Sequence, residues 1–171
     1  MKKIVVFGKP GSGKSTLSKR LASATGIRLH ALDSIEFKKN GDKVDCARYD
    51  EEHENILSSD SWIIDGFGPI ESFNKRLDVA DTLIYIDLPY RVSYWLVTKR
   101  LLKGLLVKPE GWPDGSSILK GTLESYRVLR LCPKFWNNDF MQKLEKNSTN
   151  KSLYVIRSAS ELNSFIDKNV R

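Results

Sequence analysis

The chain alternates short apolar runs with longer amphipathic stretches. Apolar runs at residues 4–7, 62–64 and 82–86 are each followed directly by a glycine or an aspartate. Runs of this length and composition predict strands that are buried on both faces. Less uniformly apolar segments at 28–32 and 151–157 predict two further strands.

Amphipathic stretches between and after these runs predict helices, at residues 15–24, 48–57, 71–79, 89–103, 117–131, 134–146 and from 158 onward. Gly26 is placed to end the first helix, Gly104 to interrupt the helix that opens at Pro89, and Pro133 to separate the next two. Ser158 and Glu161 form a capping box at the start of the last helix.

Strands that alternate with helices predict an α/β fold in which a five-stranded parallel sheet is flanked by helices. We expect one P-loop kinase-like domain over residues 1–171, with a lid or helical insertion at about 100–134. Glycines and prolines crowd residues 104–117, which is typical of a loop or lid. Ligands of such folds bind at the carboxyl ends of the strands.

The first apolar run leads into a glycine-rich segment with the P-loop pattern G-x-x-x-x-G-K-S. Its glycines let successive backbone N–H groups face one anion, and the following helix points its positive end at the same place. The residues assigned to nucleotide binding are Gly8, Pro10, Gly11, Ser12, Gly13, Lys14, Ser15 and Thr16. The alternative, a dinucleotide-binding loop, fails because Thr16 stands where its third glycine belongs.

This pattern predicts ATP and Mg²⁺ as ligands, with Lys14 on the β- and γ-phosphates and the Ser15 hydroxyl on the metal. A P-loop also needs an acidic group near the metal, usually an aspartate at the end of a neighbouring strand. Asp65 and Asp87 both qualify by position. Asp87 suits the N-cap of the helix that opens at Pro89, so Asp65 is the predicted metal residue.

Composition narrows the class of protein. The 171 residues are 40% hydrophobic, enough for the core of one domain, and the two cysteines, Cys46 and Cys132, form no C-x-x-C pair. Four apolar residues before the glycine loop are too few for a signal peptide, and no apolar stretch reaches the roughly 20 residues of a membrane helix. We expect a cytoplasmic protein with unpaired thiols.

The net charge of +7 is concentrated in one segment. Residues 90–134 hold nine basic and three acidic side chains, a net charge of +6. Such a segment suits a phosphate-binding lid or a nucleic-acid surface. Phosphoryl transfer depends on positioning and on cations around the transferred group, so Arg100, Arg127 and Arg130 are predicted catalytic residues.

Tryptophans in this chain admit two interpretations, base stacking and core packing. Trp62 begins an apolar run and Trp95 lies on an apolar helix face, so both are predicted to be core residues. Trp112, in the predicted lid loop, leaves both interpretations open.

Several segments together resemble a known family. Ile63-Ile64-Asp65-Gly66-Phe67 resembles the strand-end D-G-F of adenylate kinases, whose aspartate orients the waters of Mg²⁺. The matching segments are G-x-x-G-S-G-K-S-T-L at the start, L-H-x-L-D at 29–33, W-I-I-D-G at 62–66, R-L-x-x-A-D-T-x-I-x-x-D-L-P at 76–89 and R-S-x-x-E at 157–161. Together they resemble the FlaR-type "DNA topology modulation" proteins, an adenylate kinase-like group.

The resemblance implies that Asp33 positions or deprotonates the acceptor hydroxyl, as the equivalent aspartate does in small P-loop kinases. Adenylate kinases carry Pro-Arg after D-G-F, and the arginine grips the acceptor phosphate. Gly68 and Pro69 stand there in this chain, which argues against AMP as the acceptor.

The favoured function is therefore a phosphotransferase that moves the γ-phosphoryl of ATP·Mg²⁺ to a small-molecule acceptor. Two alternatives stay open: a nucleic-acid-associated ATP-binding protein, and an ATP-gated binding protein without an acceptor.

Overall fold

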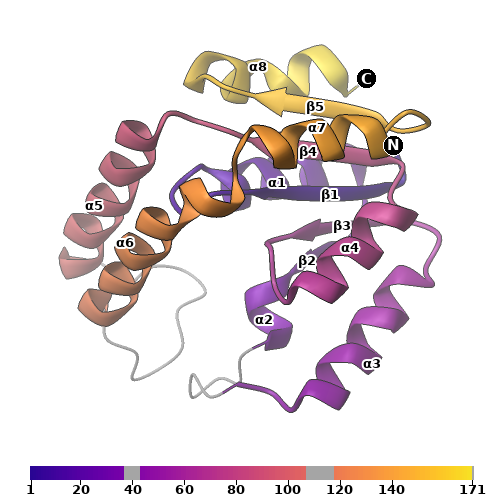
Figure 1. Cartoon of the computed structure of the whole chain (residues 1–171), viewed down its shortest axis with the longest axis horizontal. Coiled ribbons are helices and arrows are strands. Elements are labelled where there is room, and N and C mark those ends of the chain that lie inside the picture. The colour runs from indigo at the N-terminus through magenta and orange to yellow at the C-terminus, as the bar shows by residue number, and fades with distance from the viewer. Residues whose placement is uncertain (37–42, 107–117, 171) are drawn as a thin grey trace.

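A computed structural model of the chain describes residues 1–36, 43–106 and 118–170, and it has the predicted α/β fold. Five parallel strands form one sheet in the order β2-β3-β1-β4-β5 (Figure 1). The strands are β1 (Lys3–Gly8), β2 (Leu29–Ala31), β3 (Trp62–Asp65), β4 (Thr82–Ile86) and β5 (Ser152–Ile156). With β1 in the centre, the P-loop that follows it lies between the ends of β3 and β4.

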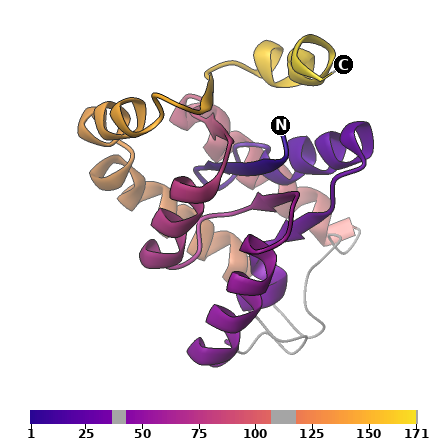
Figure 2. The ribbon, with the colours of Figure 1, turned by 90° about the vertical axis from the view of Figure 1, so that its right-hand side faces the viewer.

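Helices cover both faces of the sheet, as the edge view in Figure 2 shows. They are α1 (Lys14–Thr25), α2 (Leu32–Glu36), α3 (Cys46–Leu57), α4 (Ile70–Val79), α5 (Tyr90–Leu106), α6 (Ile118–Phe135), α7 (Asn138–Asn147) and α8 (Ala159–Asn169). α4 and α7 lie on one face and α1 and α8 on the other, while α5 and α6 extend beyond the carboxyl ends of the strands (Figure 1).

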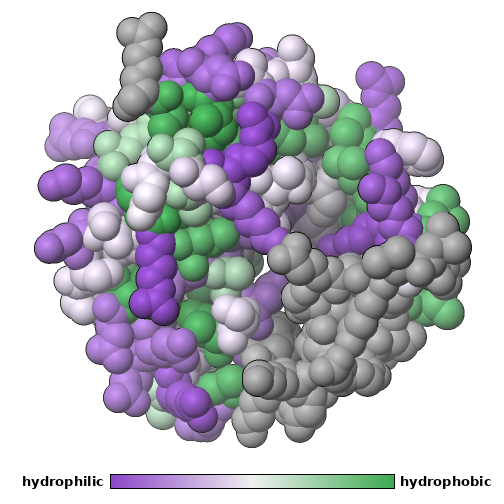
Figure 3. Space-filling model, turned by 180° about the vertical axis from the view of Figure 1, so that it is seen from behind, coloured by the Kyte–Doolittle hydropathy of each residue, from purple (hydrophilic) through white to green (hydrophobic). Residues whose placement is uncertain are grey.

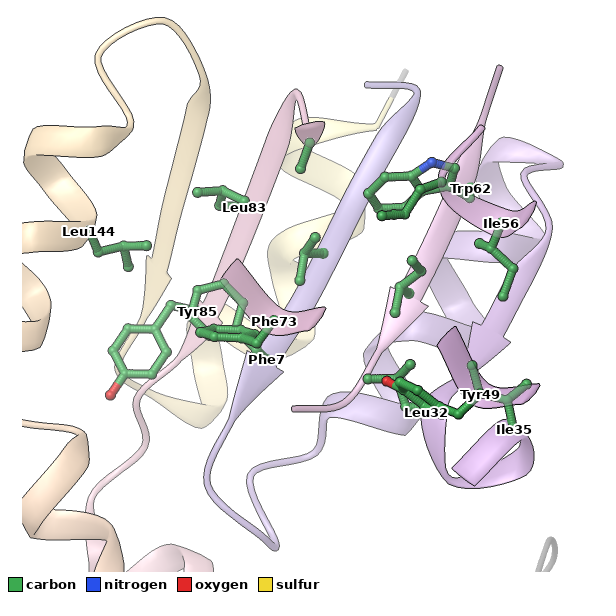
Figure 4. Packing of buried hydrophobic residues seen from close by; sticks show 14 residues of the cluster. Phe7, Leu32, Ile35, Tyr49, Ile56, Trp62, Phe73, Leu83, Tyr85 and Leu144 are labelled. Atoms are coloured by element: carbon green, nitrogen blue, oxygen red, sulfur yellow. The ribbon is translucent and has the colours of Figure 1, made fainter. Parts of the chain in front are cut away.

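Alternation along β1 separates the two halves of the core. Val5 and Phe7 join a cluster that includes Phe73 and Tyr85, and Figure 4 shows these aromatic rings side by side over β1 and β4. Ile4 and Val6 point to the opposite face, where they pack with residues of α1 and α8. Strands buried on both faces need apolar residues at every position, which is why the runs were recognisable in the sequence.

Two predicted helix ends are confirmed with their hydrogen bonds. Gly26 adopts the left-handed conformation (φ 72°) and donates its N–H to the carbonyl of Ala22 at 2.9 Å. At the start of α8, Ser158 Oγ accepts from the N–H of Glu161 at 3.1 Å, and the Glu161 carboxylate accepts from the N–H of Arg157. Both ends therefore follow from local chemistry alone.

Two predicted breaks are wrong. α5 continues through Gly104 to Leu106, since a single glycine costs only about 1 kcal/mol in a helix interior. α6 contains Pro133 and continues to Phe135. The chain turns instead at Asn137, whose side chain accepts from the N–H of Phe140 at 2.9 Å and caps α7.

Other expectations are corrected at β2 and at Trp95. β2 ends at Ala31, so Asp33 lies in the first turn of the short helix α2 rather than at a strand end. Trp62 is completely buried, as predicted, but Trp95 is 59% exposed on α5. Trp112 and most of the predicted lid loop fall outside the described residues.

The surface seen from behind, over α1 and α8, carries mainly hydrophilic side chains with scattered apolar ones (Figure 3). Within the described residues, no helix combines the length and apolar character needed to cross a bilayer. Neither described cysteine is in a disulfide: Cys46 is exposed and Cys132 is buried.

A buried polar cluster lies under the loop that follows β3. Arg76 is 0% exposed and donates through Nη2 to the carbonyl of Phe67. Its Nη1 lies 3.1 Å from His53 Nε2. Burial lowers the pKa of Arg76 to about 10. Burial and, as the second cause, the positive charge of Arg76 lower the pKa of His53 to about 4. His53 therefore stays neutral and accepts a hydrogen bond from Arg76.

This arrangement predicts that acid destabilises the fold through His53. The unfolded chain binds a proton on His53 below about pH 6.5 and the folded protein only below about pH 4, so stability falls as the pH drops through that window. Between pH 7 and 4.5 the His53 contribution to the free energy of unfolding falls by about 2 kcal/mol. Urea denaturation at pH 7 and pH 4.5 measures this change in the free energy of unfolding.

His53→Gln is the matched variant, because Gln keeps an acceptor near Nε2 but does not titrate. We expect the variant to lose about 2 kcal/mol less than the wild type over the same pH interval. An equal loss in both proteins contradicts the assignment.

Candidate functional site

The P-loop has the backbone that its glycines predict. Gly8, Gly11 and Gly13 have φ values of 145°, 67° and 84°, which side-chain-bearing residues rarely adopt. A Cβ at Gly8 would lie 2.3 Å from the carbonyl oxygen of Ile86, and one at Gly11 would lie 2.5 Å from that of Ser93. The loop is thus pressed against the end of β4 and the first turns of α5, and glycine is required at both contacts.

Lys14 extends back across this loop. Its Nζ donates to the carbonyl of Lys9 at 2.9 Å, so the loop itself provides a partner for the ammonium. Burial lowers the pKa of Lys14, and the carboxylates of Asp65 and Asp33 oppose this shift. Lys14 therefore lies within the electrostatic reach of both aspartates that the sequence singles out.

Asp65 ends β3 next to the P-loop and is only 6% exposed. In the described part of the chain its Oδ1 has no hydrogen-bond partner, and the buried Ser12 Oγ has none either. Burial raises the pKa of Asp65, while Lys14 and the Ser15 hydroxyl oppose the rise. A buried carboxylate oxygen without a partner, close to a hydroxyl, fits a hard cation such as Mg²⁺.

Asp33 and Arg100 face the same space from α2 and α5. Asp33 is exposed and contributes to the electrostatic environment of Lys14, Asp65 and Arg100. Burial lowers the pKa of Arg100 and the Asp33 carboxylate opposes the shift, although part of the Arg100 side chain reaches solvent. Arg100 Nη2 also donates to Ser125 Oγ at 2.9 Å, which links α5 to α6.

The other two predicted arginines are exposed on α6. Arg127 is 76% exposed, and its Nη1 lies 3.9 Å from Glu124 Oε2 on the same helix. Arg130 is exposed on α6. Their catalytic roles stay predictions. The nucleotide-binding roles of the exposed Ser15 and Thr16 and of the partly buried Pro10 stay predictions too, as does the metal-binding role of Ser15.

An ion pair that the sequence reasoning missed lies under the P-loop. Lys9 is 2% exposed, and its ammonium pairs with the Asp87 carboxylate. The interpretation of Asp87 as an N-cap is wrong, because α5 begins at Tyr90 and the N–H groups of Val92 and Ser93 donate to the carbonyl of Pro89. The Oδ1 of Asp87 binds Lys9 instead. Local patterns could not reveal a contact between residues 78 positions apart, although the apolar surroundings of Lys9 in the sequence, Phe7 and Pro10, hinted that it is buried.

Phe67 fixes the loop that follows Asp65. Its ring centroid lies 4.6 Å from that of Phe73, 5.0 Å from that of Phe135 and 5.5 Å from that of Trp136. Trp136 in turn stacks on Tyr85 at 5.2 Å, so α4, β4 and the end of α6 all support this loop. Aromatic pairs of this geometry are worth about 1 kcal/mol each beyond their buried area.

A cleft of about 450 Å³ lies between α4 and α7. Its lining includes Phe73, Leu77, Leu83, Phe140 and Leu144, and it includes no residue of the P-loop. The predicted chemistry is therefore on a different part of the molecule, at the carboxyl edge of the sheet.

Comparison with known proteins gives likenesses only to solved structures. No model of a protein family matches the sequence, and no curated protein matches it. Among solved structures, an unliganded sugar kinase from Janibacter sp. aligns over 98% of this chain and 93% of its own, with 18% sequence identity and a TM-score of 0.47. At this distance the likeness says nothing about substrate, and the FlaR-type resemblance stays a prediction from the sequence.

The unpartnered oxygen of Asp65 predicts a stability effect. Asp65→Asn removes a buried charge that burial disfavours, so we expect the unliganded variant to be more stable than the wild type by about 1 kcal/mol. Thermal unfolding without nucleotide or metal measures it. The exposed Asp33, changed to Asn, is the control and should unfold at the wild-type temperature; a destabilised Asp65→Asn variant would show that the carboxylate supports the fold.

Proposed function

We propose that this protein is an ATP-dependent phosphotransferase with a small-molecule acceptor: a nucleoside, a nucleotide or another small metabolite. The observation that carries the proposal is the grouping of Lys14, Asp65, Asp33 and Arg100 around the P-loop, where their charges influence one another. A nucleotide-binding loop alone would not require an acidic and a basic group on the side facing the acceptor.

ATP would bind with its phosphates in the P-loop. The backbone N–H groups of the loop and the N-terminus of α1 supply a positive potential for the phosphates. Lys14 would exchange its bond to the Lys9 carbonyl for bonds to the β- and γ-phosphates. Because burial already disfavours its charge, an anionic partner is favourable for Lys14.

Ser15 and Asp65 would hold Mg²⁺. Bound there, the ion would neutralise charge that develops between the β- and γ-phosphates. The proposed site uses two protein oxygens and leaves the remaining positions to phosphates and water, which is usual for Mg²⁺.

Asp33 would take up the acceptor. Its exposed carboxylate can accept a hydrogen bond from an acceptor hydroxyl and orient it toward the γ-phosphoryl. Arg100 would stabilise charge on the transferred group from the opposite side. The buried Arg76 is engaged with Phe67 and His53, so Arg76 is not available to grip an AMP phosphate.

We further propose that the α5–α6 pair belongs to a lid of the single domain. Tyr126 of α6 stacks on Tyr94 of α5 at 5.8 Å, and its hydroxyl lies 2.6 Å from Thr98 Oγ1. These contacts, with the bond from Arg100 to Ser125, couple the two helices, so a movement of the pair would carry Arg100 with it.

One observation favours nucleic-acid binding as a second candidate. Arg127 and Arg130 are exposed on α6, within the strongly basic segment of the sequence. Phosphate-backbone binding would weaken steeply as salt concentration rises. A small-molecule kinase would show no such affinity for DNA or RNA.

The first test is ADP release from ATP·Mg²⁺ in the presence of nucleosides, nucleoside monophosphates and small hydroxylated metabolites. We expect one class to stimulate ADP release, and Asp33→Asn to lower the stimulated kcat by roughly 100-fold or more, because general base or orienting groups contribute on that scale. Slow ATP turnover that no compound stimulates, and that Asp33→Asn leaves unchanged, contradicts the acceptor role.

A second test compares arginines on the stimulated reaction. Arg100→Ala should lower kcat roughly 100-fold, since a group that stabilises transition-state charge is worth several kcal/mol. Arg127→Ala, which removes an exposed arginine paired with Glu124, is the comparison. If Arg127→Ala has the larger effect, the closed lid brings Arg127 and not Arg100 to the phosphates.

A further inference from the structure

The ion pair between Lys9 and Asp87 lies where the ladder between β1 and β4 ends. The last paired residues in this parallel register are Gly8 and Ile86. Gly8 then turns the chain away with φ 145°, and its position for a Cβ is filled by the carbonyl oxygen of Ile86. Lys9 and Asp87 are the next residue on each side, so a side-chain contact continues the connection where backbone pairing stops.

The surroundings of Lys9 leave few other partners for its charge. The side chain is 2% exposed, whereas that of Asp87 is 32% exposed. The Lys9 ammonium lies 4.6 Å from the ring centroid of Tyr90, a cation–π contact. Burial, followed by the charge of Asp87, raises the pKa of Tyr85, and Cys132 interacts electrostatically with Lys9.

Lys9 is also part of the anion-binding loop itself. Its carbonyl accepts the bond from Lys14 Nζ, and it stands between Gly8 and Gly11, whose backbones are unusual. A change in the position of Lys9 would therefore redirect the N–H groups of the loop and the ammonium of Lys14 together. The burial of Lys9 and its pairing with Asp87 hold that position before any nucleotide arrives.

We propose that Lys9 and Asp87 are a positioning pair, in which an ion pair to the end of β4 holds the first turn of the P-loop in its anion-binding shape. The proposal rests on nucleotide binding at the P-loop and adds a role for two residues that do not touch the nucleotide. Lys9 acts through the backbone of the loop, and Asp87 acts through Lys9.

A second explanation makes the opposite prediction for one variant. If Lys9 attracted ATP through its charge alone, its removal would weaken binding, while removal of the Asp87 charge would strengthen it. If the pair positions the loop, removal of either charge weakens binding. The sign of the Asp87 effect therefore separates the two explanations.

The experiment measures the Kd of ATP·Mg²⁺ by calorimetry for the wild type, Lys9→Met, Asp87→Asn and the double variant. We expect each single variant to raise Kd about tenfold, within the range of a charge-assisted hydrogen bond. The double variant should bind no more weakly than the weaker single variant, because both substitutions remove the same contact. ADP should be affected to the same extent, since its β-phosphate uses the same loop.

Thermal unfolding is measured for each variant as a control. A variant that unfolds only well above the titration temperature is folded during the titration, so its weaker binding reflects the position of the loop and not loss of the fold. Should Lys9→Met not fold, Asp87→Asn still decides, because the side chain of Asp87 is partly exposed. Lys75→Met removes the exposed ion pair to Glu54, remote from the loop, and should leave Kd unchanged.

Failure of this proposal differs from failure of the proposed function. A wild-type protein that does not bind ATP·Mg²⁺ contradicts nucleotide binding itself. A wild type that binds, with Asp87→Asn binding equally well or more tightly, overturns the positioning pair alone. Additive effects of the two substitutions would overturn it as well.

Discussion

Buried charge near the carboxyl edge of the sheet is the constraint around which this protein is arranged. Lys9, Asp65 and Arg76 are 2%, 6% and 0% exposed, and charge is costly to remove from water unless it is paired. Lys9 has a carboxylate and an aromatic ring, and Arg76 has two neutral acceptors for its terminal nitrogens. Among the described residues, Arg76 Nε and Asp65 Oδ1 have no hydrogen-bond partner. Asp65 is the one of the two beside the P-loop, so it is the group that a ligand would complete.

Most of the fold could be predicted because its signals are local. The apolar run at Thr82–Ile86 is the strand β4 with the same bounds, and the cap at Ser158 needs only the residues of its own turn. The errors arose where tertiary packing overrides local preference. Pro133 continues a helix because its neighbours Leu129 and Cys132 are buried, and Trp95 is exposed although its spacing along α5 matches a buried face.

The site was predictable only in part, for a similar reason. The P-loop pattern is contiguous, and Asp65 ends an apolar run, so its place beside the loop followed from the geometry of parallel strands. Asp33 lies in α2 and not at the strand end that the sequence suggested. The pairs Lys9–Asp87 and Arg76–His53 join elements whose adjacency depends on the order of strands and helices in space. The hydrophobic periodicity of the sequence does not give that order. A lysine in a glycine-rich loop therefore does not indicate which carboxylate it will pair with.

The central place of β1 in the sheet also has a consequence for how the protein is made. β1 pairs with β3 and β4, and its residues leave the ribosome well before either partner: Lys9 and Asp87 are separated by 78 positions. At typical rates of synthesis, this interval corresponds to roughly 4 to 16 s. During that time β1 lacks at least one of its two partner strands, and the P-loop lacks its contacts with the end of β4. Under the proposed function, nucleotide affinity would arise only once β4 has paired with β1, so it would report that the middle of the sheet has formed.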